Sequence, residues 1–250
     1  MTRNELAEYL AEFLQVGKFR DYAPNGLQVE GRAEIKKIVT GVTACQALID
    51  KAITLNADAL LVHHGFFWKG ENDVIIGMKQ RRLKALLTHD INLFGYHLPL
   101  DAHPMLGNNS ELAKTLNISH AEVVEESTQG LIWQGCLDTP VSAGIFKEHI
   151  SDALNREALH IGDPLAEIQT IAWCTGGAQD YINDAASLGV DAFISGEVSE
   201  RTYHSALELG IHYFAAGHHA TERYGIQALG EHLAREFDIE HEYVDIDNPV

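Results

Sequence analysis

The sequence predicts an α/β protein made of two similar lobes that arose by internal duplication. The segment Ile35–Gly65 aligns without a gap on the segment Ile168–Val198, with the apolar positions in register. The Asp-Ala pairs at 58–59 and 191–192 also match. In addition, short apolar runs alternate with amphipathic stretches along most of the chain, which is typical of helical crossovers between parallel strands. A shared ungapped register is the signature of a repeated unit.

Both halves also end their aligned region with the same polar pattern. His97 is followed four residues later by Asp101, and His218 is followed four residues later by Glu222. We therefore expect one site that is assembled from both copies.

The first lobe is expected to span residues 1–125. Continuous apolar runs predict buried strands, and apolar residues at helical spacing predict amphipathic helices. Asn108 or Asn109 can cap the start of the last helix of this lobe. In chain order we expect a helix at 1–14, a strand at 36–42, a helix at 43–57, a strand at 59–65, a helix at 78–90, a strand at 91–98 and a helix at 107–118.

The second lobe is expected to span residues 126–250, with no inserted domain between the lobes. Residues 119–167 are less regular than their surroundings, and the pattern of the first lobe then restarts. The expected elements are a strand at 131–136, a helix at 143–155, a turn at 162–164, a strand at 171–174, a helix at 181–189, a strand at 191–196, a helix at 201–210, a strand at 211–217, a helix at 221–237 and a strand at 241–246.

Composition limits the class of protein. The chain has 250 residues, a hydrophobic content of 46% and no uninterrupted apolar run of membrane length, which predicts a globular protein rather than a membrane protein. The N-terminus carries glutamates in place of the basic start of a signal peptide, so we expect a cytoplasmic location. A formal charge of −18 makes nucleic acid a poor default partner. The three cysteines lack metal-type spacing and are expected to be buried free thiols.

Histidines and carboxylates follow the strand ends where ligands bind in sheets of this kind. His63 and His64 close one strand, and Glu197 occupies the repeat position that corresponds to His64. Imidazole and carboxylate together suit Zn, Fe, Mn, Co or Ni, whereas Ca and Mg prefer oxygen ligands alone. The number of candidate ligands exceeds the need of one ion, and two ions about 3.5–4 Å apart would use them all.

Each candidate also has a structural interpretation. A single histidine at a strand end more often makes structural hydrogen bonds than binds a metal, so position alone assigns neither His97 nor His219 as a ligand. The adjacent His63–His64 pair is a stronger signal, because both side chains reach one site only where the strand is ending. The remaining candidates lack a counterpart in the other half and are expected to be surface or capping residues: His103, Glu200, His204 and His212.

Several longer motifs extend these patterns over nearly the whole chain. They are DYAPNGLQVEG, LLVHHGFFWKG, NLFGYHLPLDAHPMLGNN, DAFISGEVSE and AAGHHATER, in this order. Together they closely resemble the family of GTP cyclohydrolase I type 2 homologues, also called the Nif-three-like proteins. The resemblance implies a fold of two α/β lobes and a toroidal homohexamer with metal sites facing an inner space. Longer members carry an extra domain between the lobes, which this chain lacks.

The resemblance further implies a dinuclear metal centre. Its ligands in this chain would be His63, His64, Asp101, His218 and Glu222. His97 matches the motif but is a less certain ligand, and His219 stands where the family tolerates other residues.

Two functions are compatible with these observations. The first is a metal-dependent hydrolase of a small molecule, for which a nucleotide-related compound is one candidate, and in which Glu197 or His97 moves the proton. Against a GTP substrate, the sequence has no P-loop and no basic cluster near the motifs. The second is a metal-stabilised oligomeric scaffold or regulatory interaction protein without catalysis. A metal store would prefer thiol ligands and fits the sequence poorly.

Overall fold

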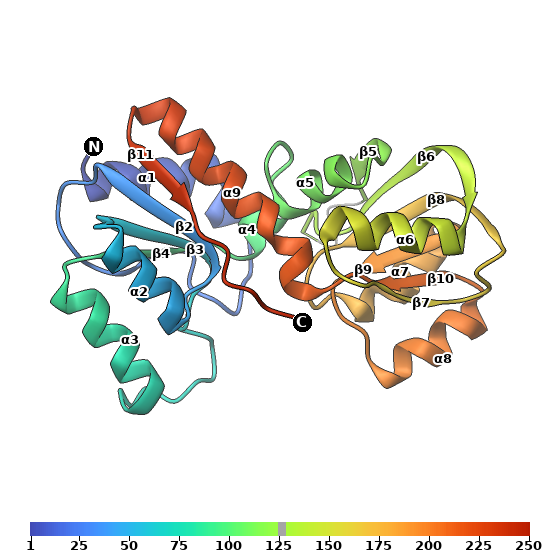
Figure 1. Ribbon diagram of the computed structural model, residues 1–250, viewed down its shortest axis with the longest axis horizontal. Helices are drawn as coiled ribbons and strands as arrows, with labels where there is room; N and C mark the ends of the chain where they lie inside the picture. The colour runs from blue at the N-terminus through green and yellow to red at the C-terminus, as the bar shows by residue number, and fades with distance from the viewer. Residues whose placement is uncertain (125–128) are drawn as a thin grey trace. The chain divides into compact units, whose positions relative to one another are not determined.

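The computed structural model describes residues 1–124 and 129–250 and has a mixed α/β fold with two sheets (Figure 1). The chain divides into two compact units. The first unit comprises Met1–Leu100 and Gly225–Asp247, and the second comprises Asp101–Tyr224 and Asn248–Val250. The predicted boundary between lobes, at residues 125 and 126, lies outside the described residues. The compact units divide the chain elsewhere, because residues 225–247 return to the first unit.

The first unit contains a five-stranded sheet in the order β1-β4-β3-β2-β11. Strands β2, β3, β4 and β11 run parallel to their neighbours, whereas β1 is antiparallel to β4. The first five residues of β3 are buried, which agrees with its apolar sequence. The strands are β1 (Gly26–Val29), β2 (Lys37–Thr43), β3 (Ala59–His64), β4 (Asn92–Gly95) and β11 (Glu240–Tyr243).

The helices of the first unit begin where the sequence supplies caps and apolar faces. Thr2 and Glu5 form a capping box at the start of α1 (Arg3–Phe13), which buries Leu6 and Leu10. Apolar residues of β2, β3 and β4 pack with those of α2 (Gln46–Thr54) and α3 (Gly77–Thr88) in one core cluster. The long helix α9 (His218–Phe237) begins in the second unit and ends in the first. A short 3-10 helix, η1, covers Val16–Lys18.

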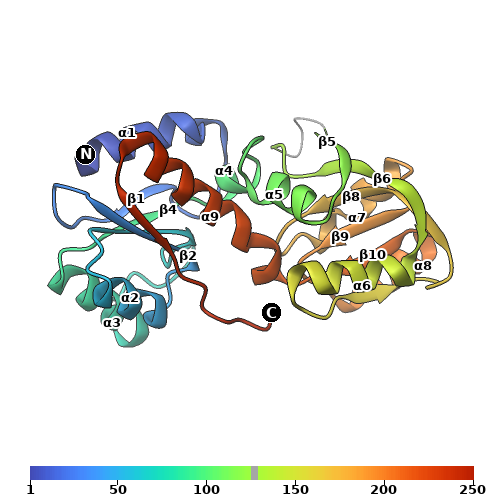
Figure 2. The same cartoon turned by 45° about the horizontal axis from the view of Figure 1, so that its top comes forward.

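The second unit contains a six-stranded sheet in the order β5-β6-β8-β9-β10-β7. Figure 2 labels β5, β6, β8, β9 and β10 of this sheet. Strands β8, β9 and β10 are parallel, and the three others pair antiparallel. The strands are β5 (Ser119–Val123), β6 (Trp133–Ser142), β7 (Leu159–Ile161), β8 (Glu167–Cys174), β9 (Ala192–Ser195) and β10 (His212–Ala215).

Alternate residues of this sheet face a core built around Trp173. Phe146 and Ile150 of α6 pack into that core together with Phe214 of β10. The short helix α4 (Leu98–Asp101) ends the first segment of the first unit, and only Asp101 belongs to the second. The helices of the second unit are α5 (Asn108–Thr115), α6 (Ala143–Leu154), α7 (Ile182–Ser187) and α8 (Glu200–Leu209), with the 3-10 helix η3 (Gln179–Tyr181) before α7. Among the helices of the described residues, none combines the length and apolar character that crossing a membrane requires.

The central strands of the two sheets share one order and one register. Within their own sheets, β2-β3-β4 and β8-β9-β10 are the parallel neighbours, and an antiparallel strand flanks β4 and β10 alike. Ile38 pairs with Ala59 in the first sheet, and Ile171 pairs with Ala192 in the second. These are the pairs of residues that the sequence alignment places in equivalent positions.

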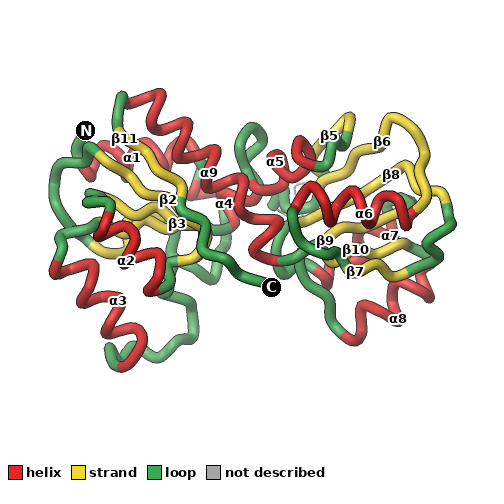
Figure 3. The backbone as a smooth tube through the Cα atoms, viewed as in Figure 1, coloured by secondary structure: helices red, strands yellow, loops and turns green. Residues whose placement is uncertain are grey.

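Every helix and strand expected from the sequence is present, with small changes at the ends (Figure 3). The sequence analysis missed β1, β5 and β7, which are short strands of three to five residues and lie at or near sheet edges. Their burial patterns are mostly partial or exposed, so they lack the apolar run that identifies a central strand.

Candidate metal centre

Three imidazole rings of the first unit lie together at the ends of β3 and β4. His63 and His64 close β3, and His97 follows β4 by two residues. Their ligand-type nitrogens lie within 4.8 Å of one another. The ring centroids of His63 and His64 are 4.4 Å apart, and that of His97 is 5.2 Å from the first and 5.6 Å from the second. We call these three residues the imidazole group.

A backbone hydrogen bond fixes the tautomer of His63. Its Nδ1 lies 3.0 Å from the carbonyl oxygen of Tyr96, and a carbonyl oxygen only accepts. Nδ1 therefore carries the proton, and Nε2 of the neutral ring presents its lone pair, which is the form that binds a metal ion. The Nδ1 of His64 lies 3.3 Å from the hydroxyl of Thr43, on the neighbouring strand.

Asp21 performs the same task for His97. The distance between Oδ1 of Asp21 and Nδ1 of His97 is 2.9 Å, and the aspartate side chain is 3% exposed. Burial alone would raise the pKa of Asp21. The hydrogen bonds from His97, Asn25 and the backbone of Ala23 outweigh this effect, so the pKa of Asp21 lies well below the usual range. The carboxylate is therefore ionised and accepts the Nδ1 proton, which leaves the lone pair of His97 on Nε2.

Asp21 and Asn25 position His97 through hydrogen bonds, and the sequence analysis did not single them out. Asn25 accepts a hydrogen bond from the backbone nitrogen of His97 at 2.7 Å, and Asp21 accepts one from the backbone nitrogen of Leu98 at 3.0 Å. Both residues stand in the DYAPNG motif, which was their only signal. The internal repeat does not point to them, because both residues lie before the aligned segment that begins at Ile35.

In the second unit, His218 lies between two carboxylates at the start of α9. Its Nδ1 is 2.7 Å from Oε1 of Glu197, and its Nε2 is 3.1 Å from Oε2 of Glu222, one helical turn later. Burial lowers the pKa of His218, but Glu222 and Glu197 raise it to about 10. In the absence of a metal the ring is an imidazolium that donates to both. A divalent ion at Nε2 would replace that proton, while Glu197 would still hold Nδ1.

Asp101 lies close to Glu222 in the same unit. One oxygen of each carboxylate lies within 4.8 Å of the other, and both residues are buried. Oδ1 of Asp101 accepts hydrogen bonds from Asn108 at 2.8 Å and from the hydroxyl of Thr175 at 3.2 Å. Two buried carboxylates this close repel each other unless a cation or proton lies with them.

The expected cap of α5 is wrong. The residue that precedes the helix is Gly107, and no side chain caps it. Asn108 instead donates to Asp101, and Asn109 accepts from the backbone nitrogen of Thr175 at 3.1 Å. Asn108 therefore orients the carboxylate of Asp101, and Asn109 connects the first turn of α5 to the residue that follows β8.

A glycine gives the Glu222 side chain its space. Gly176 follows β8 with φ +69°, a conformation that favours glycine, and a Cβ atom there would collide with Oε1 of Glu222. Glu222 is 2% exposed. The close backbone therefore confines this carboxylate beside His218. We call Asp101, His218 and Glu222 the acidic group.

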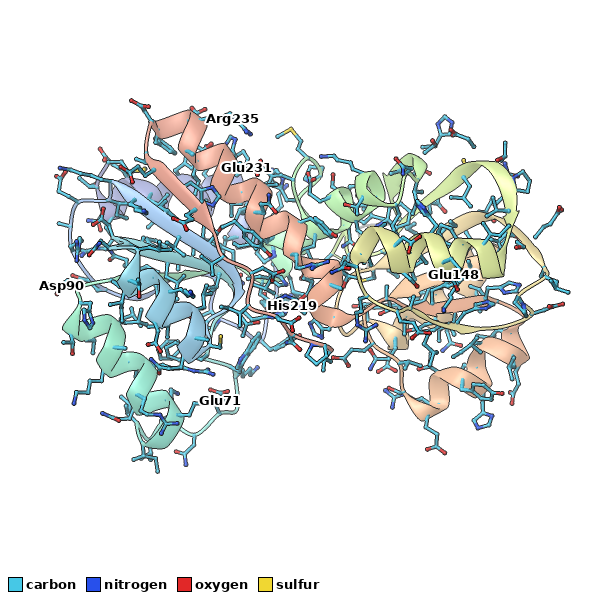
Figure 4. All side chains as sticks on the ribbon, viewed as in Figure 1. Glu71, Asp90, Glu148, His219, Glu231 and Arg235 are labelled. Atoms are coloured by element: carbon cyan, nitrogen blue, oxygen red, sulfur yellow. The ribbon has the colours of Figure 1, made fainter. Side chains whose placement is uncertain are left out.

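The other histidines lie outside these groups. His219 is labelled in Figure 4 near the start of α9, and its backbone nitrogen donates to the carbonyl oxygen of Val250 at 2.9 Å. His103 is buried and its Nδ1 accepts from the backbone nitrogens of Met105 and Leu106 at 3.4 Å, a capping role as expected.

The donors in both groups fit a divalent transition metal. The imidazole group offers three ring nitrogens, two of them with fixed tautomers, and the acidic group offers two carboxylates and one ring nitrogen. Such a mixture of nitrogen and oxygen donors suits Zn, Fe, Mn, Co or Ni. Buried His, Asp and Glu side chains of this kind are able to bind metal ions. The expectation that both groups serve one dinuclear centre stays a prediction.

Comparisons with known families, proteins and solved structures match this chain over nearly its whole length. The family model of Duf34/NIF3 (NGG1p interacting factor 3) matches residues 1–249. A protein of Yersinia pestis named GTP cyclohydrolase 1 type 2 homolog is 56% identical, with all of both chains covered. The solved structure titled protein ybgI, unknown function, is 54% identical with a TM-score of 0.94 over all of both chains. The solved structure of TTHA1606 from Thermus thermophilus is 30% identical with a TM-score of 0.90, again over both full chains.

Proposed function

The chain belongs to the Duf34/NIF3 family, and from that premise we propose that it is a metal-dependent hydrolase with two divalent transition-metal ions. The proposed ligands are His63, His64, Asp101, His218 and Glu222. Such ions, when bound, lower the pKa of a coordinated water and orient a substrate. The substrate is a small molecule, and the name of the relatives makes a nucleotide-related compound the first class to test.

The observation that carries this proposal is the control of imidazole protonation. His63 and His97 each donate Nδ1–H to a fixed acceptor, the Tyr96 carbonyl and the Asp21 carboxylate respectively. A metal ligand needs one ring nitrogen held by a hydrogen bond so that the other is deprotonated and aimed, and the bond from His63 to the Tyr96 carbonyl meets this need. Glu197 holds His218 in the same manner.

The residues proposed to move protons are His97 and Glu197. His97 is paired with an ionised Asp21, which stabilises the ring when it takes a second proton. Glu197 is partly exposed, with 38% of its side chain accessible, so it is able to exchange protons with solvent while it orients His218. Both therefore have the chemistry of a proton carrier beside a ligand.

The test combines metal analysis with turnover. We expect about two transition-metal ions per chain after gentle purification, because five ligands exceed the four of one tetrahedral ion. The loaded protein is then incubated with nucleotides, phosphoesters and cyclic amides, and turnover of one class should disappear with a chelator. His63→Ala and Glu222→Ala remove one ligand from each group, and Glu208→Ala serves as an exposed control.

Three outcomes of these assays separate the alternatives. If each ligand variant lowers the content of both ions, the two groups serve one dinuclear centre. If each lowers only its own ion, the groups bind separately. Bound metal without turnover of any class, together with loss of the oligomer on chelation, would favour the metal-stabilised scaffold over the hydrolase.

We further propose a toroidal homohexamer and a cytoplasmic location, which rest on family resemblance and on the N-terminal sequence. The internal duplication is supported by the shared strand order of the two sheets. Its strongest support is a repeated anchor, in which Oδ2 of Asp58 and Oδ2 of Asp191 each accept two successive backbone N–H groups.

A further inference from the structure

A cavity of about 370 Å3 opens in the first unit between residues 21–24 and 67–79. Its volume is in the range of small-molecule sites. Its lining includes Tyr22, Trp68, Lys69, Glu71, Asp73 and Lys79. None of them belongs to the proposed metal ligands. We call this cavity the aromatic pocket.

Two aromatic rings form one wall of the pocket. The centroids of Tyr22 and Trp68 are 5.6 Å apart with planes inclined by 30°. Tyr22 is 56% exposed, so its ring is accessible to a ligand from solution. The backbone nitrogen of Lys69 donates to the carbonyl oxygen of Tyr22 at 2.8 Å and so joins the two segments. The rings therefore form a prepared surface on which a flat group can stack.

The wall adjoins the imidazole group. The rings of Tyr22 and Trp68 meet His97 edge to face, with centroid distances of 5.0 and 5.3 Å. The ring centroid of Trp68 also lies 5.8 Å from that of His64. A ring that stacks on this wall therefore lies next to the proposed metal ligands, which is the place for the recognised part of a substrate.

The polar groups of the pocket carry both signs of charge. Nζ of Lys79 lies 4.0 Å from a carboxylate oxygen of Glu71 and 5.2 Å from the ring centroid of Phe67, and the lysine side chain is only 19% exposed. A carboxylate accepts an N–H, and an ammonium donates to a carbonyl oxygen. A ligand edge that has an N–H beside a C=O satisfies both at once, and this is the edge of a cyclic amide.

We propose that the aromatic pocket binds a planar nitrogen heterocycle, stacked on Tyr22 and Trp68 with its amide edge toward Glu71 and Lys79. The assignment rests on the proposed function for the neighbouring imidazole group and names the substrate class of that site. It separates nucleobases that present N–H beside C=O from those that do not. Inosine and purine riboside form a matched pair of probes, since purine riboside lacks both the C=O and the N–H of that edge and has nearly the same shape.

The test measures binding of both nucleosides by tryptophan fluorescence of the full-length protein. Trp133 and Trp173 are 4% and 0% exposed, so Trp68 is the tryptophan that a ligand reaches. We expect saturable quenching by inosine and binding of purine riboside that is weaker by about tenfold or more, because each lost hydrogen bond to a charged group costs about that factor. Tyr22→Leu should weaken inosine binding by about tenfold, since stacking is lost while the reporter stays.

Two further variants complete the design. Lys79→Met keeps the aliphatic chain but removes the ammonium, so inosine should lose much of its advantage over purine riboside. Tyr203→Leu replaces a tyrosine that is 50% exposed on α8 and should leave both affinities unchanged. Equal binding of the two nucleosides, an unchanged affinity in Tyr22→Leu, or no saturable binding at all would overturn the assignment.

The same titrations are made with chelated and with metal-loaded protein. Inosine binding that depends on Tyr22, in a protein that hydrolyses nothing, would refute the hydrolase and leave the pocket assignment standing. Metal-dependent turnover that is unchanged in Tyr22→Leu would support the hydrolase and refute the pocket assignment.

Discussion

At the scale of single residues, protonation decides what each imidazole is able to do. His63 and His97 have one nitrogen committed to an acceptor, and His218 has a carboxylate at each nitrogen. Residue type and spacing pointed to these histidines, but the sequence could not assign their tautomers. The partners come from distant segments, such as Asp21 for His97, and no local pattern connects residues that are 76 positions apart.

His218 should make the stability of the metal-free protein depend on pH. Its pKa is about 10 in the fold and about 6.5 in an unfolded chain. A pKa raised by folding gives stability that is complete below the unfolded value and disappears as the pH rises through the folded value. The free energy of unfolding should therefore fall between about pH 6.5 and 10. Urea unfolding at several pH values measures this fall.

The variant Glu197→Gln should make that fall smaller, because Glu197 is one of the two carboxylates that raise the pKa of His218. Glu208→Gln, an exposed change on α8, is the control and should behave as wild type. Identical pH profiles for Glu197→Gln and wild type would refute this account of His218.

Gly176→Ala should lower metal affinity through a collision, and Gly189→Ala is its matched control. Both glycines have positive φ, at +69° and +72°, so an alanine at either costs about 1–2 kcal/mol of backbone strain. Only at position 176 would the new Cβ meet Glu222. Metal titration and urea unfolding should show a loss of stability in both variants, larger in Gly176→Ala because of the collision, and weaker metal binding in Gly176→Ala alone. Equal metal affinity in the two would mean that Glu222 is no ligand.

At the scale of elements, the central strands were predictable and the edge strands were not. β3 and β9 are apolar runs that end in polar residues, a pattern that depends only on burial of both faces. β1, β5 and β7 pair by backbone hydrogen bonds with little apolar burial, so their existence depends on a neighbour that the sequence does not specify. The register supplies a further finding. Asn92 pairs with Ala59, and His212 pairs with the equivalent residue Ala192, so Asn92 and His212 occupy equivalent positions. Counting five residues forward makes Gly217 the equivalent of His97, and His218 therefore lies one position later.

Asp58 and Asp191 should each stabilise the start of a strand, β2 and β8 respectively, by accepting two successive backbone N–H groups. Asp58 accepts from the backbone nitrogens of Lys36 and Lys37 at 2.7 and 2.9 Å, and Asp191 accepts from its two counterparts at 2.9 and 2.8 Å. Hydrogen bonds to a charged group contribute about 1.5–3 kcal/mol. Asp58→Ala and Asp191→Ala should each lower the free energy of unfolding by about that amount.

Asp50→Ala is the control for this pair. Asp50 is exposed and its side chain accepts only from Gln46 among the described bonds. Its replacement should change the free energy of unfolding by less than about 0.5 kcal/mol. Similar values for all three variants in urea unfolding would show that the anchors contribute nothing particular.

At the scale of the whole molecule, the sequence predicted the fold class and the family, but not how the chain is shared between compact units. The aligned segments describe a repeat in which one half follows the other. In the structure, however, residues 225–247 of the second half belong to the same compact unit as residues 1–100. The signal for this lies in the pairing of β11 with β2, which are remote in sequence. Periodicity reports the burial of a strand but not the partner that it will choose.

The position of β11 delays completion of the first sheet during biosynthesis. Thr43 and Tyr243, which end the paired strands β2 and β11, are separated by roughly 200 residues. A ribosome that adds about 5–20 residues per second needs about 10–40 seconds to cover that distance. Throughout this interval the nascent chain presents β2 as an unprotected edge, the kind of surface that recruits strands from other molecules. Chaperone occupancy on ribosomes carrying the growing chain should therefore persist until synthesis is nearly complete.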